Sequence, residues 1–156
     1  MSEQASVYES LKSRIGQEIH TSDWLEITQA RVDAFGDATD DHQWIHVDKE
    51  RAARESPWGG TIAHGYLTLS LYPMLRGLVT ADRPVYPGVR NVINYGLNKL
   101  RFPQAVRVGK RVRARCTLLA IEEVSGGLQM TEQYSVEIEG EAKPACVAEA
   151  IMRIYF

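Results

Sequence analysis

The chain has 156 residues, of which 44% are hydrophobic and 24% are charged, and its formal net charge at pH 7 is −2. These values predict a single globular domain over residues 1–156 with a hydrophobic core of ordinary size. The balanced charge excludes the strongly basic surface that nucleic-acid-binding proteins use, and the chain lacks the run of about 18 apolar residues that a membrane-spanning helix needs.

The N-terminal stretch MSEQASVYESLKSRIGQ is polar and has no apolar signal core, so we expect a cytoplasmic protein. Cys116 and Cys146 both stand in apolar, strand-like runs. In the cytoplasm such cysteines are expected to be reduced and buried rather than joined as a disulfide.

The first half of the chain predicts short helices and one strand. A helix is expected over residues 6–15 and a strand over residues 18–27. Thr28 is the expected N-cap of a helix that runs to about Asp37, and Asp48 is the expected N-cap of the next helix. Both side chains can accept a hydrogen bond from a free backbone N–H group in the first helical turn.

Residues 65–79 are the most apolar helical segment of the chain. Apolar residues recur there at helical spacing and also cover much of the remaining circumference, which predicts a helix that is buried on nearly all sides. Pro73 is expected to kink this helix, because proline removes one backbone hydrogen bond and crowds the carbonyl group of Leu69.

The second half of the chain predicts β-strands. Apolar and polar residues alternate over residues 111–121, 128–138 and 145–156, as in an antiparallel sheet with one buried face. Residues 89–102 are also strand-like, although neither face is clearly apolar. We therefore predict an α+β fold in which a curved antiparallel sheet of four or five strands wraps around a long central helix.

The stretch TDDHQWIH, residues 39–46, contains two adjacent carboxylates and two histidines. His42 and His46 are spaced as in the zinc-protease pattern H-E-x-x-H, but Gln43 stands where that pattern needs a glutamate, and an amide cannot accept a proton. The sequence therefore predicts no metal site here. A polar loop whose aspartates cap a helix is a second interpretation, which does not account for the two apolar residues before the second histidine.

A third interpretation is an acid–base pair formed by Asp41 and His46. A carboxylate and an imidazole that share one water molecule can orient it, accept its proton and return a proton to a substrate carbon. The pKa of histidine lies nearest to neutral pH, and a nearby carboxylate can tune it further. This interpretation makes the two residues the candidate catalytic groups.

From about Arg31 to Leu78 the chain resembles the MaoC-like, (R)-specific enoyl-CoA hydratase family. The family signature reads aromatic, small residue, Gly-Asp, any residue, Asn-Pro, aliphatic, His, and then Ala or Ser after five residues. The positions in register with this signature are Phe35, Thr39, Asp41, Ile45, His46 and Ala52. Three positions depart from it: Asp40 replaces Gly, Gln43 replaces Asn, and Trp44 replaces Pro, which is the largest change.

A second block, TIAHGYLTLSL over residues 61–71, is similar to the family's His-Gly segment at the start of the central helix. Gly65 has no Cβ atom and offers a free N–H group at a helix N-terminus, so a thioester carbonyl can approach it and be polarised. A plain turn is the alternative role for this glycine. His64 is expected to hold the turn, and Ser70 is either a support for the acid–base pair or a packing residue.

The resemblance implies a hot-dog fold and a homodimer whose sheets join edge to edge. Residues 89–102 are then a candidate dimer interface, or alternatively a solvent-exposed edge strand that Lys99 and Arg101 keep soluble. The implied partner is an acyl-CoA or acyl-carrier-protein thioester as substrate. No metal or nucleotide cofactor is expected, and the chain has neither a G-x-G-x-x-G nor a Walker pattern.

The activity that the resemblance implies is reversible hydration of a trans-2-enoyl thioester to an (R)-3-hydroxyacyl thioester. Asp41 and His46 would hold and activate the water, and Gly65 would bind the thioester carbonyl. Two other classes of function stay open at this point: a non-catalytic hot-dog protein that binds acyl thioesters or signals, and an acyl-CoA thioesterase. A hot-dog fold alone does not separate them, because function resides in the site.

Overall fold

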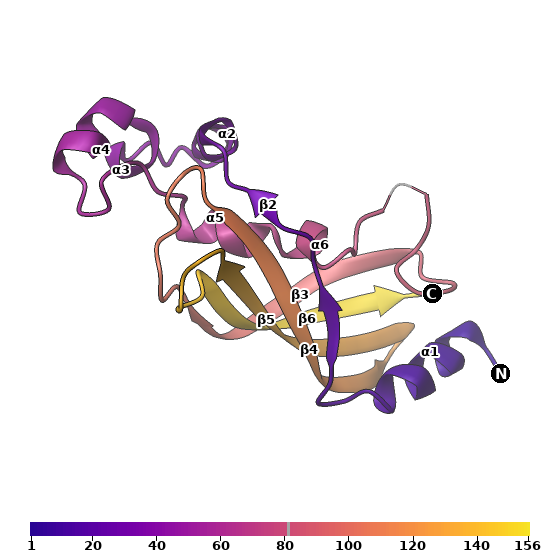
Figure 1. The fold of residues 1–156 in the computed structure, drawn as a ribbon. Coiled ribbons are helices and arrows are strands. Elements are labelled where there is room, and N and C mark those ends of the chain that lie inside the picture. The colour runs from indigo at the N-terminus through magenta and orange to yellow at the C-terminus, as the bar shows by residue number, and fades with distance from the viewer. Residues whose placement is uncertain (81) are drawn as a thin grey trace.

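One antiparallel sheet and a set of short helices make up the structure, a computed structural model that describes residues 1–80 and 82–156 (Figure 1). The strands are β1 (Glu18–Thr21), β2 (Leu25–Glu26), β3 (Asn91–Arg101), β4 (Arg111–Val124), β5 (Gly127–Ile138) and β6 (Cys146–Tyr155). The helices are α1 (Glu3–Lys12), α2 (Gln29–Thr39), α3 (Trp44–Val47), α4 (Lys49–Glu55), α5 (Gly65–Ser70) and α6 (Tyr72–Leu75). Within the described residues the sheet has six strands in the order β1-β4-β5-β6-β3, and β2 pairs with β4. The predicted α+β architecture is confirmed.

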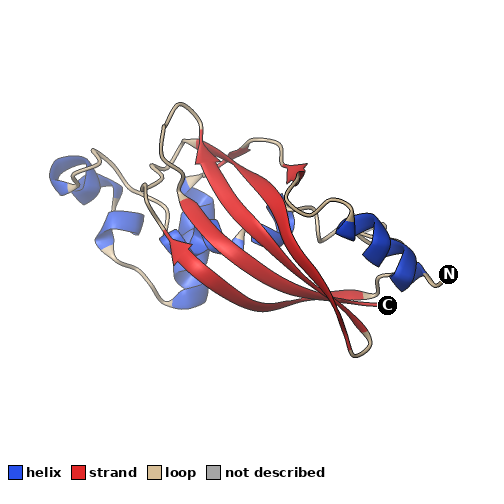
Figure 2. Ribbon diagram, turned by 90° about the horizontal axis from the view of Figure 1, so that it is seen from below, coloured by secondary structure: helices blue, strands red, loops and turns tan. Residues whose placement is uncertain are grey.

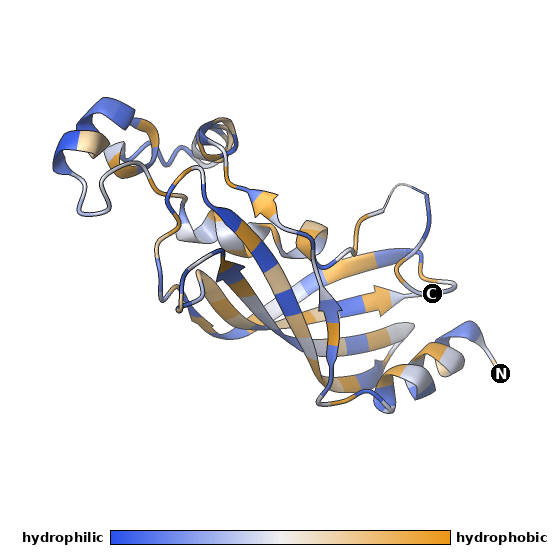
Figure 3. Cartoon of the chain, viewed as in Figure 1, coloured by the Kyte–Doolittle hydropathy of each residue, from blue (hydrophilic) through white to orange (hydrophobic). Residues whose placement is uncertain are grey.

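The central strands β4, β5 and β6 build the hydrophobic core by alternation of their side chains. In β6 every second residue from Cys146 to Ile154 is buried, and the residues between them are partly exposed. Figure 3 shows this alternation as hydrophobic and hydrophilic bands along the strands. Cys116 and Cys146 are buried free thiols, as the sequence predicted.

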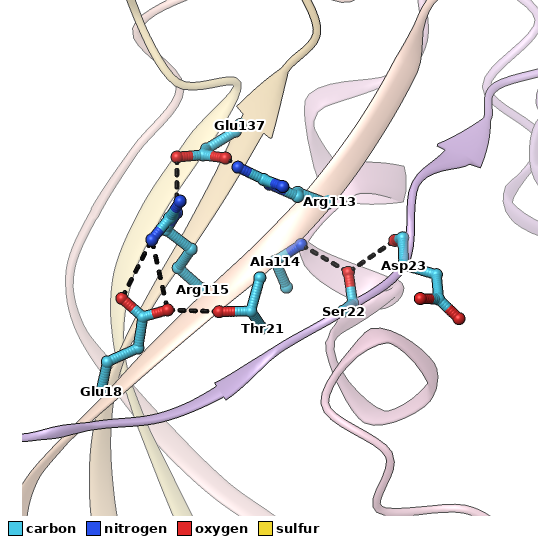
Figure 4. A network of polar contacts seen from close by, with 8 residues as sticks. All are labelled: Glu18, Thr21, Ser22, Asp23, Arg113, Ala114, Arg115 and Glu137. Carbon is cyan, nitrogen blue, oxygen red and sulfur yellow. Dashed lines mark hydrogen bonds and ion pairs between the residues drawn. The ribbon is translucent and has the colours of Figure 1, made fainter.

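The predicted strand over residues 18–27 is divided into β1 and β2, which both pair with β4. Between them the Ser22 hydroxyl accepts a hydrogen bond from the N–H group of Ala114 at 2.8 Å and donates one to the carbonyl of Asp23 at 2.8 Å (Figure 4). A side chain thus replaces part of the strand ladder, which separates β1 from β2. The number of strands consequently exceeds the predicted four or five.

A network of charged side chains joins β1, β4 and β5 (Figure 4). The Nε of Arg115 donates to Glu137 at 2.7 Å, and its terminal nitrogen donates to Glu18 at 3.1 Å. Arg113 donates to the other oxygen of Glu137 at 2.6 Å, and the Thr21 hydroxyl donates to Glu18. Each such pair is partly exposed and screened by solvent, so the network reinforces a sheet that apolar burial already holds together.

Two predicted caps are confirmed at the starts of α2 and α4. Thr28 accepts a hydrogen bond from the N–H group of Arg31 at 3.2 Å, and Asp48 accepts one from Arg51 at 2.9 Å. The first helix begins earlier than predicted because the Ser2 side chain caps it. The single turn of α3 has no counterpart among the predicted helices.

The central helical segment is shorter than predicted and is divided in two. α5 ends at Ser70 and α6 begins at Tyr72, and both lie on one face of the sheet (Figures 1 and 2). Pro73 causes the break, because it has no N–H group to donate to the carbonyl of Leu69. This agrees with the kink that the sequence predicts. Gly77, with φ 75°, then turns the chain away before the predicted end of the helix.

A buried polar network fastens α6 to the sheet. Glu132 of β5 is fully buried and accepts hydrogen bonds from the guanidinium of Arg76 at 2.8–3.0 Å and from the hydroxyl of Tyr72 at 2.6 Å. Arg76 also donates to the hydroxyl of Tyr86 at 2.9 Å. Charges buried this deeply need such partners, so the network holds α6 and the segment that carries Tyr86 in place against β5.

The helices outside the central segment lie in two separate places. α2, α3 and α4 lie together beyond the start of α5, whereas α1 lies near the two chain termini (Figure 1). The turn between α2 and α3 therefore meets the N-terminal end of α5, which is where the candidate site forms. In the described part of the chain, no helix is both long enough and apolar enough to cross a membrane.

Candidate active site

The turn after α2 brings Asp41 to the start of α5. Asp40 ends the helix with φ 57° and ψ 21°, a left-handed conformation that aspartate adopts more readily than most residues. The chain reverses there, and the main-chain oxygen of Asp41 accepts a hydrogen bond from Nε2–H of His64 at 2.9 Å. The carboxylate of Asp41 remains half-exposed, with Oδ2 3.9 Å from the same nitrogen.

His46 is buried in α3 and has a defined tautomer. Its Nδ1 lies 2.8 Å from the carbonyl oxygen of Ile62. Because a carbonyl oxygen only accepts hydrogen bonds, Nδ1 carries the proton in this contact. In the neutral ring the lone pair is therefore on Nε2, and His46 is oriented to accept a proton at that atom.

The surroundings of His46 favour its neutral form. Burial lowers the pKa of His46 below its ordinary value of 6.5, because water no longer stabilises the charged ring. The hydrogen bond to Ile62 and the charge of Asp41 oppose this change, whereas His64 adds to it. The ring is consequently neutral at pH 7, which is the state that a general base needs.

His64 contacts both members of the predicted acid–base pair. Its ring stacks on His46 with the centroids 3.8 Å apart and an interplanar angle of 25°, and Phe35 packs against it at 5.0 Å. Since Nε2 donates to Asp41, the lone pair of His64 is on Nδ1, which is buried and has no hydrogen-bond partner among the described residues. The sequence predicted that His64 holds the turn; the structure extends this role to the Asp41 main chain and the His46 ring.

The three side chains form a cluster whose fit to a metal ion can be tested. A carboxylate oxygen of Asp41 and one nitrogen each of His46 and His64 lie within 4.8 Å of one another. A histidine binds a metal through a lone pair in the plane of its ring, at about 2.0–2.1 Å for zinc. An ion midway between two stacked rings would lie outside the plane of each, so this arrangement does not fit a metal ion and is better suited to holding water.

His42, the other histidine of the HQWIH stretch, is not part of this cluster. Its Nε2 lies 2.9 Å from a carboxylate oxygen of Asp37, and both side chains are largely exposed. The cluster instead contains His64, which lies in a separate sequence block. The H-x-x-x-H spacing is therefore not what brings the histidines of this site together.

A cavity of about 470 Å³ opens beside His46. Its walls include Trp58, Gly65, Phe102 and the segment of residues 103–106. The N–H group of Gly65 is the first of α5 and has no hydrogen-bond acceptor within the described residues, as is usual for the first turn of a helix. The cavity thus combines a proton acceptor with an available backbone donor.

The space beside Cα of Gly65, which was expected to admit a thioester carbonyl, is filled by a side chain. A Cβ atom at this position would lie 3.1 Å from Cγ of Phe102 and 3.2 and 3.3 Å from its Cδ atoms. The aromatic ring of Phe102 therefore occupies the direction in which substrate was expected to approach. Sequence reasoning missed Phe102, because no local pattern connects it with a glycine in another sequence block.

Ser70 lies outside the cavity beside His46. It lines a second hollow of about 380 Å³ between the central helices and β3, together with Asn94 and Tyr95. Among the described residues, Ser70 belongs neither to the cluster of Asp41, His46 and His64 nor to the wall of the cavity beside His46. Within one chain the structure does not bring Ser70 to the pair, and its side chain is exposed at the wall of this hollow.

Comparisons with known proteins agree on one family. Residues 10–139 match the family model described as a MaoC like domain. The chain is 52% identical over 144 residues to 3-hydroxyacyl-thioester dehydratase Z of Mycobacterium tuberculosis (strain ATCC 25618 / H37Rv), covering 92% of each chain. It is 46% identical over 145 residues to Nodulation protein N of Rhizobium leguminosarum bv. viciae, covering 92% of this chain and 88% of that protein. A solved structure, the (R)-hydratase from A. caviae involved in PHA biosynthesis, is similar with a TM-score of 0.69 and 27% identity, covering 88% of this chain and 94% of that one.

Proposed function

The chain belongs to the MaoC-like dehydratase family, and from this premise we propose that it reversibly hydrates a trans-2-enoyl thioester to an (R)-3-hydroxyacyl thioester. As a member of this family it is a hydro-lyase with the predicted hot-dog fold. The names of the dehydratase relative and the (R)-hydratase structure support the thioester substrate and the (R) configuration. The observation that carries the proposal is that a carboxylate oxygen of Asp41 lies within 4.8 Å of a ring nitrogen of His46, and that His46 lines a cavity with a free backbone donor.

The water molecule is activated by the acid–base pair. Nε2 of neutral His46 takes a proton from the water as its oxygen attacks C3 of the substrate, and the Asp41 carboxylate orients that water. The pair then returns a proton to C2, so no net proton is gained or lost. The hydrogen bond from Nδ1–H to Ile62 keeps the reactive nitrogen in the correct tautomer throughout.

The thioester carbonyl is polarised by the N–H group of Gly65. Attack at C3 moves negative charge onto the carbonyl oxygen, so a hydrogen bond to that oxygen is stronger in the transition state than in the ground state. The donor and His46 both face the same cavity, which allows one substrate to reach both.

A homodimer completes the proposal. β3 lies at one end of the strand order, and Ile93, Tyr95 and Leu97 on it are large, exposed apolar side chains. An edge strand with unpaired backbone groups and apolar side chains is a template for pairing with another chain. A second copy of the chain would join here by a two-fold axis and cover the hollow beside Ser70.

Crotonyl-CoA assayed with two readouts tests the proposed activity. We expect the absorbance of the conjugated double bond to disappear without release of free thiol, and we expect the rate to survive exhaustive treatment with EDTA. Release of thiol would identify a thioesterase. Binding of crotonyl-CoA without either reaction would favour the non-catalytic alternative, for which the similarity to Nodulation protein N is the relevant observation.

The dependence of hydration on pH follows from the environment of His46. The base must be neutral, and burial lowers its pKa below 6.5. We therefore expect kcat/KM to decline toward low pH with a midpoint below pH 6.5, as His46 becomes protonated. A decline with a midpoint above pH 7 in a pH–rate profile would contradict this assignment of the base.

A further inference from the structure

β3 contains one extra residue near its C-terminal end. Asn98 pairs with Glu149 of β6, and Arg101 pairs with Val147, so a step of three residues on β3 matches a step of two on β6. Lys99 lies within this irregularity and has φ 52°. A left-handed conformation is unfavourable for lysine, and a bulge of this kind commonly redirects a side chain next to a functional site.

The bulge determines which way Phe102 points. Directly paired residues lie on the same face of a sheet, and Glu149 and Val147 belong to the outward-facing set of β6. Asn98 and Arg101 therefore both point outward, and Phe102, which follows Arg101, points inward to α5. Without the extra residue the alternation would turn Phe102 to the outer face.

The inward-facing ring of Phe102 is packed on the first turn of α5. It lies 3.1 Å from the position of a Cβ atom at Gly65 and makes an edge-to-face contact with Tyr66, with the ring centroids 5.7 Å apart. The same ring lines the cavity that contains His46. Phe102 is 39% exposed, so the ring covers the glycine without being enclosed by the core.

We propose that Phe102 is a positioning residue of the thioester site: the bulge at Lys99 turns its ring onto Gly65, where the ring holds the N–H group of that glycine toward the cavity. The inference rests on the proposed function, which assigns this N–H group to the substrate carbonyl. Without the ring, the first turn of α5 can shift relative to His46. A displacement of about 1 Å can lower the rate of a positioned reaction about a hundredfold.

Steady-state kinetics test the positioning role. Phe102→Ala is expected to lower kcat for crotonyl-CoA by at least about tenfold and to change KM much less, because the contact aligns the donor rather than binding the substrate. Phe102→Tyr keeps the ring and should restore most of the rate. Ile15→Ala is the control: this apolar side chain is exposed to a similar extent and lies outside the cavity, so kcat should be retained. A Phe102→Ala protein with unchanged kcat would overturn the proposal.

A thermal unfolding cycle tests the packing contact without any assay of activity. Gly65→Ala should be less favourable for the Tm of the otherwise wild-type protein than for that of the Phe102→Ala protein, because the new methyl group meets the Phe102 ring only in the former. In the Phe102→Ala background the same change should leave the Tm unchanged or raise it, since alanine favours a helix more than glycine does. Equal losses of Tm in both backgrounds would refute the contact. If the wild-type protein has no hydratase activity, the proposed function fails, and this cycle still decides whether the two residues are coupled.

Discussion

Replacing Asp41 with Asn, or His46 with Asn, is expected to lower kcat for enoyl-thioester hydration by at least about a hundredfold. The asparagine at position 46 keeps an N–H group near the place of Nδ1 and can still donate to the carbonyl of Ile62, but it has no basic nitrogen. The asparagine at position 41 keeps the size of the side chain and removes its charge. The two changes therefore remove the basic nitrogen and the negative charge, respectively, while they retain much of the local structure.

The double variant distinguishes a shared role from two separate ones. Because both side chains act on one water molecule, the double variant should be little slower than the slower single variant. His42→Gln is the matched control, since this histidine belongs to the same stretch but is exposed and paired with Asp37. It should leave kcat within about twofold. Multiplicative losses, or a near-normal rate for either single variant, would contradict the assignment.

Replacing Gly65 with Pro is expected to lower kcat at least about a hundredfold, because the change removes the N–H group that would stabilise negative charge on the thioester oxygen. Gly65 is the first residue of α5, a position where proline is compatible with a helix. His64 has φ −59° and ψ 136°, the extended conformation that a residue before proline adopts. The variant is therefore expected to fold.

Gly65→Ala is the control that isolates the N–H group. Both substitutions place a Cβ atom against Phe102, but only proline also removes the donor. We expect the proline variant to be slower than the alanine variant by a further factor of at least about ten in kcat, with a smaller difference in KM. Circular dichroism and binding of an acyl-CoA establish that each variant is folded. Equal kcat values for two folded variants would show that the carbonyl is held elsewhere.

The sequence alone determined the elements of this protein that depend on near neighbours. Alternation of apolar and polar residues identified β4, β5 and β6, because a strand that covers a core buries every second side chain. Thr28 and Asp48 were recognisable as caps, because a cap bonds to an N–H group only three residues away. Asp41 and His46 are predicted as the catalytic pair in the same way, since they belong to one short stretch that resembles a family signature.

Only the tertiary structure decided how separate segments meet at the site. The contact of His64 with Asp41 joins residues 23 positions apart, and the Phe102 ring reaches Gly65 from another layer of the fold. Ser70 lies one turn from the site along α5 but faces β3, because the direction of a helical side chain depends on how the whole helix is docked. The bulge at Lys99 reverses the faces of Arg101 and Phe102 at the end of β3, and no periodic pattern in the sequence predicts a single inserted residue.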